Sequence, residues 1–197
     1  MARRTIRHIA SGAALTRRAV LLAVAALLAW CEPDAAQEPL DPSSLYTVPM
    51  AARNDKTDDV ILMLQQGRLP TGTDGTGETA LGYAAQFGDA RMAQALLYYK
   101  APVNAKDQFG NAPLHWAARR GDSTIIQLLL DAKATIDAQN LQGMTPLMMA
   151  ANTGQVQAVR LLLKNGADPH RGDFTGRDAV GWADGKPAVL QFLRAAK

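Results

Sequence analysis

The sequence repeats itself every 33 residues, and this period restricts the fold more than any other feature of the chain. An acidic or amide residue recurs at that spacing as Asp74, Asp107, Asn140 and Asp173, and a glycine follows three residues later each time. A period of this length is typical of an array of similar units, each of which buries its apolar face against the next unit. The chain is therefore expected to form a solenoid rather than a single globular core.

Each full unit contains two short helical patterns. In the central unit, Leu114, Ala117 and Ala118 recur at the spacing of one helical face. Pro113 directly precedes them, at the position where a helix begins and a missing N–H group costs nothing. Further along the unit, a second buried stripe is expected from Ile125, Ile126, Leu129 and Leu130. The pattern predicts a pair of helices in every unit.

The first half of the central unit reads DQFGNAPLHWAARRGD, and the neighbouring units carry the same pattern with substitutions. This pattern resembles the ankyrin repeat, whose signature has an aspartate, a glycine, then T-P-L-H-x-A-A, a further glycine and a leucine pair. The resemblance covers about residues 45–197. It implies an all-α repeat solenoid in which each unit is a β-turn or hairpin loop followed by two antiparallel helices. It also implies a surface that binds other proteins.

The period divides the chain into repeats, caps and an N-terminal arm. Gly185 comes two residues earlier than the period predicts, so the last unit is expected to have a shortened first helix. Lys100 and Lys133 stand where other units have a helix-end glycine, which predicts a left-handed backbone at both lysines. The segments are 1–31, an export signal; 32–44, a proline-rich linker; 45–73, an N-terminal capping unit; 74–106, 107–139 and 140–172, full repeats; and 173–197, a C-terminal capping unit.

Residues 1–31 have the composition of an export signal. They hold five arginines and no acidic residue, and an uninterrupted apolar run extends from Ala19 to Cys31. As a helix, this run spans roughly 20 Å, less than the ~30 Å hydrocarbon core of a bilayer, which favours a cleaved signal. A short uncleaved anchor or a buried helix is the alternative. The order Thr16-Arg17-Arg18 before apolar residues resembles the twin-arginine signal, and an ordinary Sec signal is the alternative.

The cleavage position stays open at this point. Leu28-Ala29-Trp30-Cys31 resembles the box that precedes a lipidated cysteine, although Trp30 stands where a small residue is expected. Cleavage after Cys31 or Ala36 is the alternative. The protein is expected to be periplasmic or exported, with the signal segment or a lipid on Cys31 as its only membrane attachment. The proline-rich linker that follows is expected to be an extended tether.

Charge and motifs exclude several functions. Without the five arginines of residues 1–31, 16 basic residues face 18 acidic ones, a net charge of −2. Residues 32–197 therefore lack the excess of basic residues that binding to a phosphate backbone requires, so no nucleic-acid partner is expected. The sequence carries no zinc-binding or nucleophile motif, and the glycine-rich residues 72–77 fit the repeat turn better than a phosphate loop. We therefore expect no enzyme activity, no cofactor and no metal, and a structural role for His115.

A surface rich in aromatic residues is the remaining candidate for function. One large side chain per unit recurs at the 33-residue spacing, as Tyr83, Trp116, Met149 and Trp182, and packing between units is the alternative role for this row. Other large apolar residues, Phe109, Leu141 and Phe174, stand at the turn tips. Large aromatics and arginine dominate the hot spots of protein interfaces. The candidate protein-binding residues are Tyr83, Phe87, Phe109, Trp116, Arg119, Arg120, Leu141, Met149, Phe174 and Trp182.

Together, the resemblance and this surface favour a monomeric, non-catalytic module that binds another protein. We expect it to act as a scaffold or assembly factor in the bacterial cell envelope. The alternative is an inhibitor or immunity protein that blocks a toxin or an enzyme through the same surface. The partner itself is not identified by the sequence.

Overall fold

The computed structural model describes residues 47–195 of the chain. The expected export signal at 1–31 and linker at 32–44 lie outside the described residues, as do residues 45, 46, 196 and 197. Everything that follows on structure refers to the array of helices within residues 47–195.

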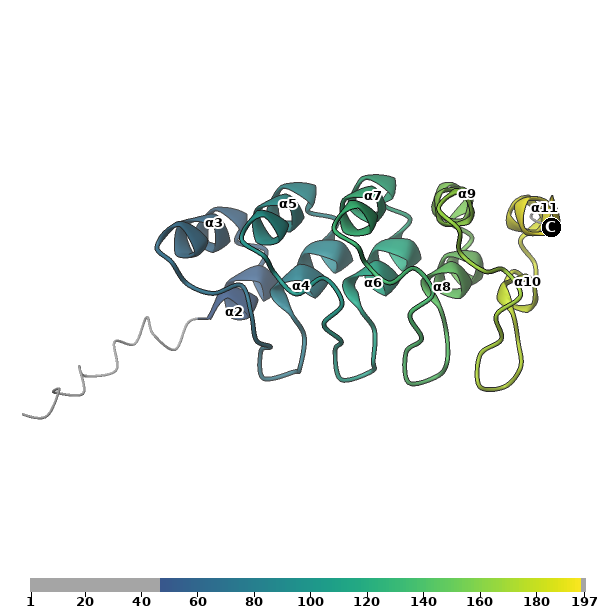
Figure 1. Cartoon of the computed structure of the whole chain (residues 1–197), viewed down its shortest axis with the longest axis horizontal. Helices are drawn as coiled ribbons and strands as arrows, with labels where there is room; N and C mark the ends of the chain where they lie inside the picture. Colours follow the sequence, from purple (N-terminus) through teal and green to yellow (C-terminus); the bar gives the residue numbers. More distant parts are fainter. Residues whose placement is uncertain (1–46, 196–197) are drawn as a thin grey trace, which may run out of the picture. The chain divides into compact units, whose positions relative to one another are not determined.

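The described residues form ten helices in two layers, with the loops on one side of the array (Figure 1). The inner layer lies next to the loops and contains α2 (Val48–Arg53), α4 (Ala80–Phe87), α6 (Pro113–Arg120), α8 (Pro146–Thr153) and α10 (Ala179–Trp182). The outer layer contains α3 (Thr57–Gln65), α5 (Ala90–Tyr98), α7 (Ser123–Asp131), α9 (Val156–Lys164) and α11 (Pro187–Ala195). This is the all-α repeat solenoid that the period predicts.

Local chemistry sets the ends of the inner helices. The hydroxyl of Thr79 accepts from the backbone N–H of Gly82 and so caps α4, and Thr145 caps α8 in the same way. Proline is the first residue of α6 and α8, as expected for a helix start. Glycine in the left-handed conformation ends three of these helices, for example Gly121 with φ 86° after α6. These signals keep the inner helices short and evenly spaced.

Alanine and leucine build the core between the layers. The inner-layer alanines Ala117 and Ala118 are fully buried and allow neighbouring inner helices to approach closely. On the outer helices, Ile125, Ile126 and Leu129 are fully buried. The expected buried stripe of α7 is narrower than the sequence pattern indicates, because Leu130 is only half-buried. Each unit thus buries its apolar face mainly against the next unit, and the core runs along the whole array.

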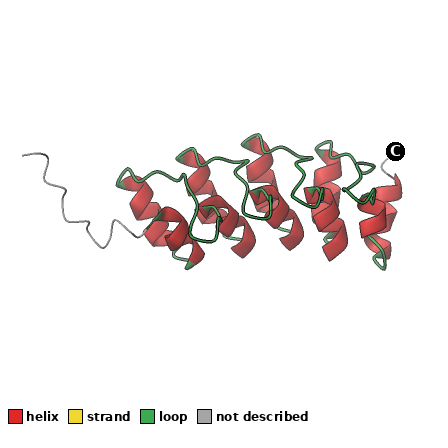
Figure 2. Ribbon diagram, turned by 90° about the horizontal axis from the view of Figure 1, so that it is seen from below, coloured by secondary structure: helices red, strands yellow, loops and turns green. Residues whose placement is uncertain are grey.

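The aspartate that begins each unit closes its turn. In the central unit, Asp107 Oδ1 accepts from the backbone N–H groups of Phe109 and Asn111, each at 2.8 Å. The turns also bond to one another, since Asn140 Nδ2 donates to Asn111 Oδ1 at 2.9 Å. Within the described range no strand forms, and only an isolated bridge joins Thr73 and Thr79. Figure 2 shows these loops in front of the inner helices.

The last unit is shortened as the sequence predicts. Helix α10 has four residues, and α11 begins at Pro187, only 31 residues after the start of α9 at Val156. Asp178 Oδ1 caps α10 by accepting from the backbone N–H of Gly181 at 2.8 Å. The array therefore ends on a smaller inner helix that α11 covers.

The left-handed backbone predicted at two lysines is confirmed. Lys100 has φ 65° and Lys133 has φ 67°, against 84° and 91° for Gly67 and Gly166 at the matching positions. A side chain with a Cβ atom is strained in this conformation by about 1 kcal/mol or more. Both lysines therefore lower the stability of the array slightly.

Replacing Lys133 with glycine is expected to raise the free energy of unfolding by about 0.5–1 kcal/mol. Relief of the strain outweighs the extra freedom that glycine gives the unfolded chain. Lys164→Gly is the matched control: Lys164 is exposed at the end of α9 in the helical conformation, so glycine there should destabilise. Thermal melting of both variants checks this. A lower melting temperature for Lys133→Gly would contradict the strain argument.

Candidate protein-binding groove

Three adjoining hollows on the loop side of the inner helices share Trp116, and we call them together the Trp116 groove. The largest, about 450 Å³, lies between the C-terminal ends of α4, α6 and α8. A second of about 280 Å³ lies towards the turn tips, and a third of about 160 Å³ lies towards the preceding unit. The largest hollow is lined by Gln86, Trp116, Arg119, Arg120, Thr153 and Gln155.

Three units have an aromatic side chain nine residues after the turn aspartate, and in each of them that side chain donates a hydrogen bond to the aspartate. The Tyr83 hydroxyl donates to Asp74 Oδ2 at 2.7 Å. The indole N–H of Trp116 donates to Asp107 Oδ2 at 3.1 Å. Trp182 and Asp173 make the same bond at 3.0 Å in the last unit. The turns thereby fix the orientation of the rings along the groove side.

The remaining unit departs from this pattern at both positions, because Asn140 replaces the aspartate and Met149 replaces the ring. The row of turn residues and the row of large side chains were not connected from the sequence. The signal that could have found the connection is the constant spacing of nine residues together with the joint exchange in this unit.

The row Tyr83, Trp116, Met149 and Trp182 is divided between the two roles that the sequence left open, packing between units and binding of a partner. Tyr83 is buried at 7% exposed and stacks on the half-buried Phe87, with ring centroids 5.8 Å apart. It therefore contributes mainly to packing. Trp116, Met149 and Trp182 are half-buried: one side of each packs on the core and the other faces solvent. Binding by these three residues remains a prediction.

The apolar residues at the turn tips are exposed, as predicted from their place in the repeat. Phe109, Leu141 and Phe174 are 59%, 69% and 71% exposed. The backbone N–H of Leu141 donates to Phe109 O at 3.0 Å, so consecutive tips lie side by side. Phe174 N–H donates to the carbonyl oxygen of Gln142 at 3.3 Å. These three side chains form a turn-tip ridge along one edge, and Phe109 and Leu141 line the Trp116 groove.

Two exposed arginines stand at the C-terminal end of α6. The Arg119 guanidinium lies 5.4 Å from the centre of the Trp116 ring, a cation–π distance. Arg120 Nη1 donates to the carbonyl oxygen of Gln86 at 3.2 Å. Three ion pairs are found within residues 47–195, and neither arginine belongs to them. Both guanidinium groups are thus held in place without a carboxylate partner in the described part of the chain.

A buried carboxyl group that the sequence analysis missed lies at the floor of the groove. Glu78 is 7% exposed and accepts from the backbone N–H of Thr79 at 2.9 Å. Its carboxyl group fills the space beside Gly82, which stands where the central unit has His115. Burial raises the pKa of Glu78 to about 7, and the nearby carboxylates of Asp107 and Asp74 act in the same direction.

The pKa of Asp74 responds in the opposite direction. Burial alone would raise it, but hydrogen bonds from Thr76, Tyr83 and Glu78 N–H together lower it to about 2. Of the two neighbouring carboxyl groups, Asp74 and Glu78, Asp74 is therefore the charged one. Its Oδ2 also lies 3.5 Å from Arg53 Nη1. Glu78 is the group that is still partly protonated near neutral pH.

His115 has the structural role that the sequence indicated. It is fully buried, its Nδ1 accepts from the backbone N–H of Ala112, and its Nε2 lies 3.1 Å from Met144 O in the next unit. Burial lowers the pKa of His115, which keeps the ring neutral. His170 is exposed in a loop. In the region the structure describes, no group of three or more potential metal ligands is close enough to hold an ion.

Comparison with known families agrees with this geometry. The model of ankyrin repeats (three copies) matches residues 49–140 and, in a second alignment, residues 84–173. No curated protein matches the chain. The two alignments together span residues 49–173, well over half of the sequence, and they include the helices and turns that form the groove. The chain belongs to the ankyrin-repeat family.

Proposed function

We propose that the protein is a non-catalytic scaffold or assembly factor that grips another protein of the cell envelope through the Trp116 groove and the turn-tip ridge. Ankyrin repeats are generally protein–protein interaction modules. The observation that carries the proposal is the ridge itself: three large apolar side chains, each more than half exposed, stand in line beside two arginines that have no carboxylate partner within residues 47–195. Contiguous exposed apolar surface with a polar rim is typical of an interaction site.

The envelope location is part of the proposal and rests on residues 1–31, with their five arginines and their apolar run. No helix in residues 47–195 is long and apolar enough to cross a bilayer. A chain without residues 1–31 should stay in the cytoplasm on fractionation. Changing Arg17 and Arg18 to lysine should abolish export by the twin-arginine route and leave a Sec signal working. Export of the truncated chain would contradict this part of the proposal.

The double substitution Phe109→Ser with Phe174→Ser is expected to weaken partner binding strongly while costing little stability. Both side chains are more than half exposed, and exposed substitutions usually change stability by about 0.5 kcal/mol or less. Truncated hot-spot aromatics typically lose about 2 kcal/mol or more of binding free energy each. A melting curve and a pull-down from periplasmic extract, made for each variant, measure the two effects.

Two controls make the result interpretable. Leu62→Ser removes an apolar side chain that is 53% exposed on the outer helix α3, so it should keep both stability and binding. Trp116→Ala should lower the melting temperature, since Trp116 is half-buried and bonded to Asp107. If the double variant melts early, the ridge is part of the core. If it melts normally and captures the same partners, the ridge is not the binding edge. The activity of the captured partner, measured with and without this protein, separates a scaffold from an inhibitor, because only an inhibitor lowers that activity.

A further inference from the structure

We propose that the Trp116 groove binds an acidic segment of the partner, in which aspartate or glutamate side chains pair with Arg119 and Arg120 and a large apolar side chain lies against Phe109 and Leu141. This inference rests on the proposed function and goes beyond it by stating the chemistry of the segment that is bound.

The two guanidinium groups are already oriented for such a partner. Arg119 is 5.4 Å from the Trp116 ring centre, and Arg120 is hydrogen-bonded to Gln86 O at 3.2 Å. Arg120 also covers Gly88, the C-cap of α4, so closely that a Cβ there would displace the guanidinium group. Groups that are held before binding lose less conformational entropy when a ligand arrives. Guanidinium groups match carboxylates in geometry and can bind them through two parallel hydrogen bonds.

The other side chains of the largest hollow leave this charge uncompensated. Gln86, Thr153 and Gln155 are neutral, and the hollow is lined by no carboxylate. The two carboxylates that line the adjoining smallest hollow, Asp107 and Glu78, are each at most 9% exposed. Asp107 is satisfied by donors from its own unit, among them the Trp116 indole. A partner in the largest hollow therefore meets two arginines as its charged contacts.

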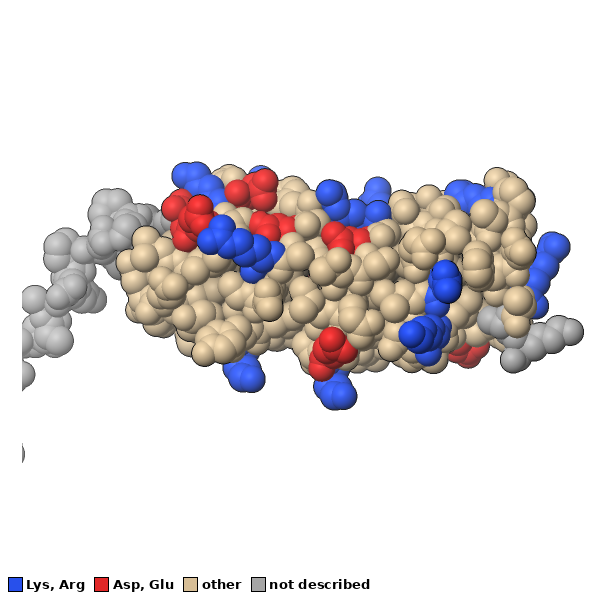
Figure 3. Space-filling model, turned by 90° about the horizontal axis from the view of Figure 1, so that it is seen from above, with Lys and Arg blue, Asp and Glu red and all other residues tan. Residues whose placement is uncertain are grey.

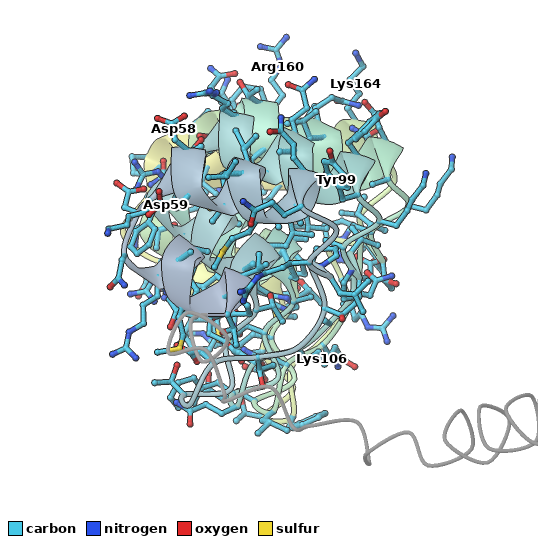
Figure 4. All side chains as sticks on the ribbon, turned by 90° about the vertical axis from the view of Figure 1, so that its left-hand side faces the viewer. Asp58, Asp59, Tyr99, Lys106, Arg160 and Lys164 are labelled. Carbon is cyan, nitrogen blue, oxygen red and sulfur yellow. The ribbon has the colours of Figure 1, made fainter. Side chains whose placement is uncertain are left out.

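Several acidic residues lie on the outer layer, away from the groove. Figure 3 looks onto the outer layer and shows acidic side chains towards its N-terminal end. Asp58 and Asp59 belong to α3 in that layer, as Figure 4 shows from the end of the array. Residues 32–197 carry a net charge of −2, so the pair of arginines forms a local positive site in an otherwise slightly acidic chain. Charge complementarity of this kind selects an acidic partner and speeds its association.

The apolar part of the proposal comes from the hollow next to the arginines. It has a volume of about 280 Å³ and lies between Phe109 and Leu141, with Trp116 and Met149 also in its wall. Arg119 lines this hollow as well as the largest one. A carboxylate and a large apolar side chain on one segment can therefore occupy neighbouring places. A nucleic acid would need a longer row of cations than these two arginines supply.

A random peptide library displayed on phage, selected on the purified protein, tests the proposal. The enriched peptides are expected to combine aspartate or glutamate with an aromatic or leucine side chain. The affinity of a selected peptide should fall roughly thirtyfold in the variant Arg119→Gln with Arg120→Gln. Arg160→Gln is the matched control, because Arg160 is exposed on outer helix α9 and should leave the affinity unchanged. Melting curves establish that each variant is folded.

Reversing the charge of both arginines and of the peptide gives a test in which a gain of binding is expected, and not only a loss. The variant Arg119→Glu with Arg120→Glu should reject the acidic peptide and bind the same peptide with lysines in place of its acidic residues. Enrichment of neutral or basic peptides, no enrichment at all, tight binding of a single-stranded oligonucleotide instead, or equal affinity in the arginine variants would each overturn the proposal. None of these outcomes affects the ridge test with Phe109→Ser and Phe174→Ser, so the two failures are distinguishable.

The chain's own acidic residues 32–44 are a competing occupant that the same assay detects. This segment contains Glu32, Asp34, Glu38 and Asp41 and no basic residue. Changing these four residues to their amides should leave the peptide affinity unchanged. A marked gain in affinity would mean that the groove holds its own linker rather than a partner, and the proposal would then be wrong.

Discussion

Alanine at Gly143 is expected to lower the free energy of unfolding by about 3 kcal/mol. Gly143 has φ 79°, and a Cβ atom there would lie 2.5 Å from the backbone nitrogen of Phe174 and 2.7 Å from its Cδ1. Strain in the left-handed region costs about 1 kcal/mol, and forcing the next turn away adds a cost of the same order or more. The loss measures how tightly one turn stacks on the next.

Gly176→Ala is the matched control for this prediction. Gly176 occupies the same place in the last turn, with φ 83°, but no atom lies within 4 Å of the position that its Cβ would take. It should therefore lose only the backbone strain of about 1 kcal/mol. Chemical denaturation of both variants gives the two values. Equal losses would show that contact between successive turns contributes nothing to the stability of the array.

Glutamine at Glu78 is expected to raise the free energy of unfolding above about pH 7 by between about 1 and 3 kcal/mol. The carboxyl group is buried beside Asp74 and Asp107, so its charged form is disfavoured and its pKa rises to about 7 from 4.5. The difference between these values corresponds to roughly 3 kcal/mol at most, and solvent screening at the edge of the groove reduces it. Glutamine keeps the acceptor for Thr79 N–H without the charge.

The sign of the pH dependence follows from the raised pKa. Between about pH 4.5 and 7 the folded protein holds a proton that the unfolded chain releases, so the contribution of Glu78 is largest below pH 4.5 and is lost as the pH rises to about 7. His115 acts in the opposite direction, because its lowered pKa destabilises the fold below its usual value of 6.5. The difference between Glu78→Gln and the parent protein cancels the effect of His115 and isolates Glu78.

Measured by denaturation at several pH values, that difference should be small near pH 4.5 and grow to its full size above pH 7. Asp58→Asn is the control, since Asp58 is exposed and paired with Arg91 on the outer layer. The growth of the difference with pH should be specific to Glu78→Gln. A constant difference for Glu78→Gln would contradict the buried, protonated state of this carboxyl group.

The architecture could be predicted from sequence because the residues that define a unit act locally. Asp107 closes its own turn, Pro113 starts the helix that follows it, and Gly121 ends that helix. Each of these roles depends on the conformation of neighbouring residues, so the period carries the register directly. The same reasoning gave the left-handed Lys133 and the shortened last unit. The exposure of Phe109 and Phe174 also follows, because a turn tip projects away from the stacked helices.

The floor of the groove could not be predicted in the same way, because it depends on contacts between units. Glu78 lies in the place beside Gly82 that a larger side chain at position 82 would fill, and its raised pKa depends on Asp107 in the next unit. The last unit has a similar exchange: Arg177 covers Gly181 and lies 4.5 Å from the Trp182 ring centre. Glu78 and Arg177 each precede the N-cap of their helix, so neither exchange follows the helical spacing that the sequence pattern shows.

The aromatic row shows where interpretation of the sequence reaches its limit. The period places Tyr83, Trp116 and Trp182 at equivalent positions, yet their surroundings differ. Tyr83 is covered by Phe87 and by its own turn, while Trp116 borders three hollows. The side chains around each ring decide which one stays accessible, and a motif does not encode them. The groove is therefore centred on Trp116 rather than spread evenly along the row.

Photo-crosslinking in living cells tests most directly whether this groove is the binding site. A photoreactive phenylalanine analogue replaces Gln108 or Thr153, which line the groove and are exposed, or Gln157, which is exposed on the outer helix α9. A crosslinked partner of the same mass is expected from positions 108 and 153, and none from position 157. Crosslinks from position 157 alone would contradict binding in the groove.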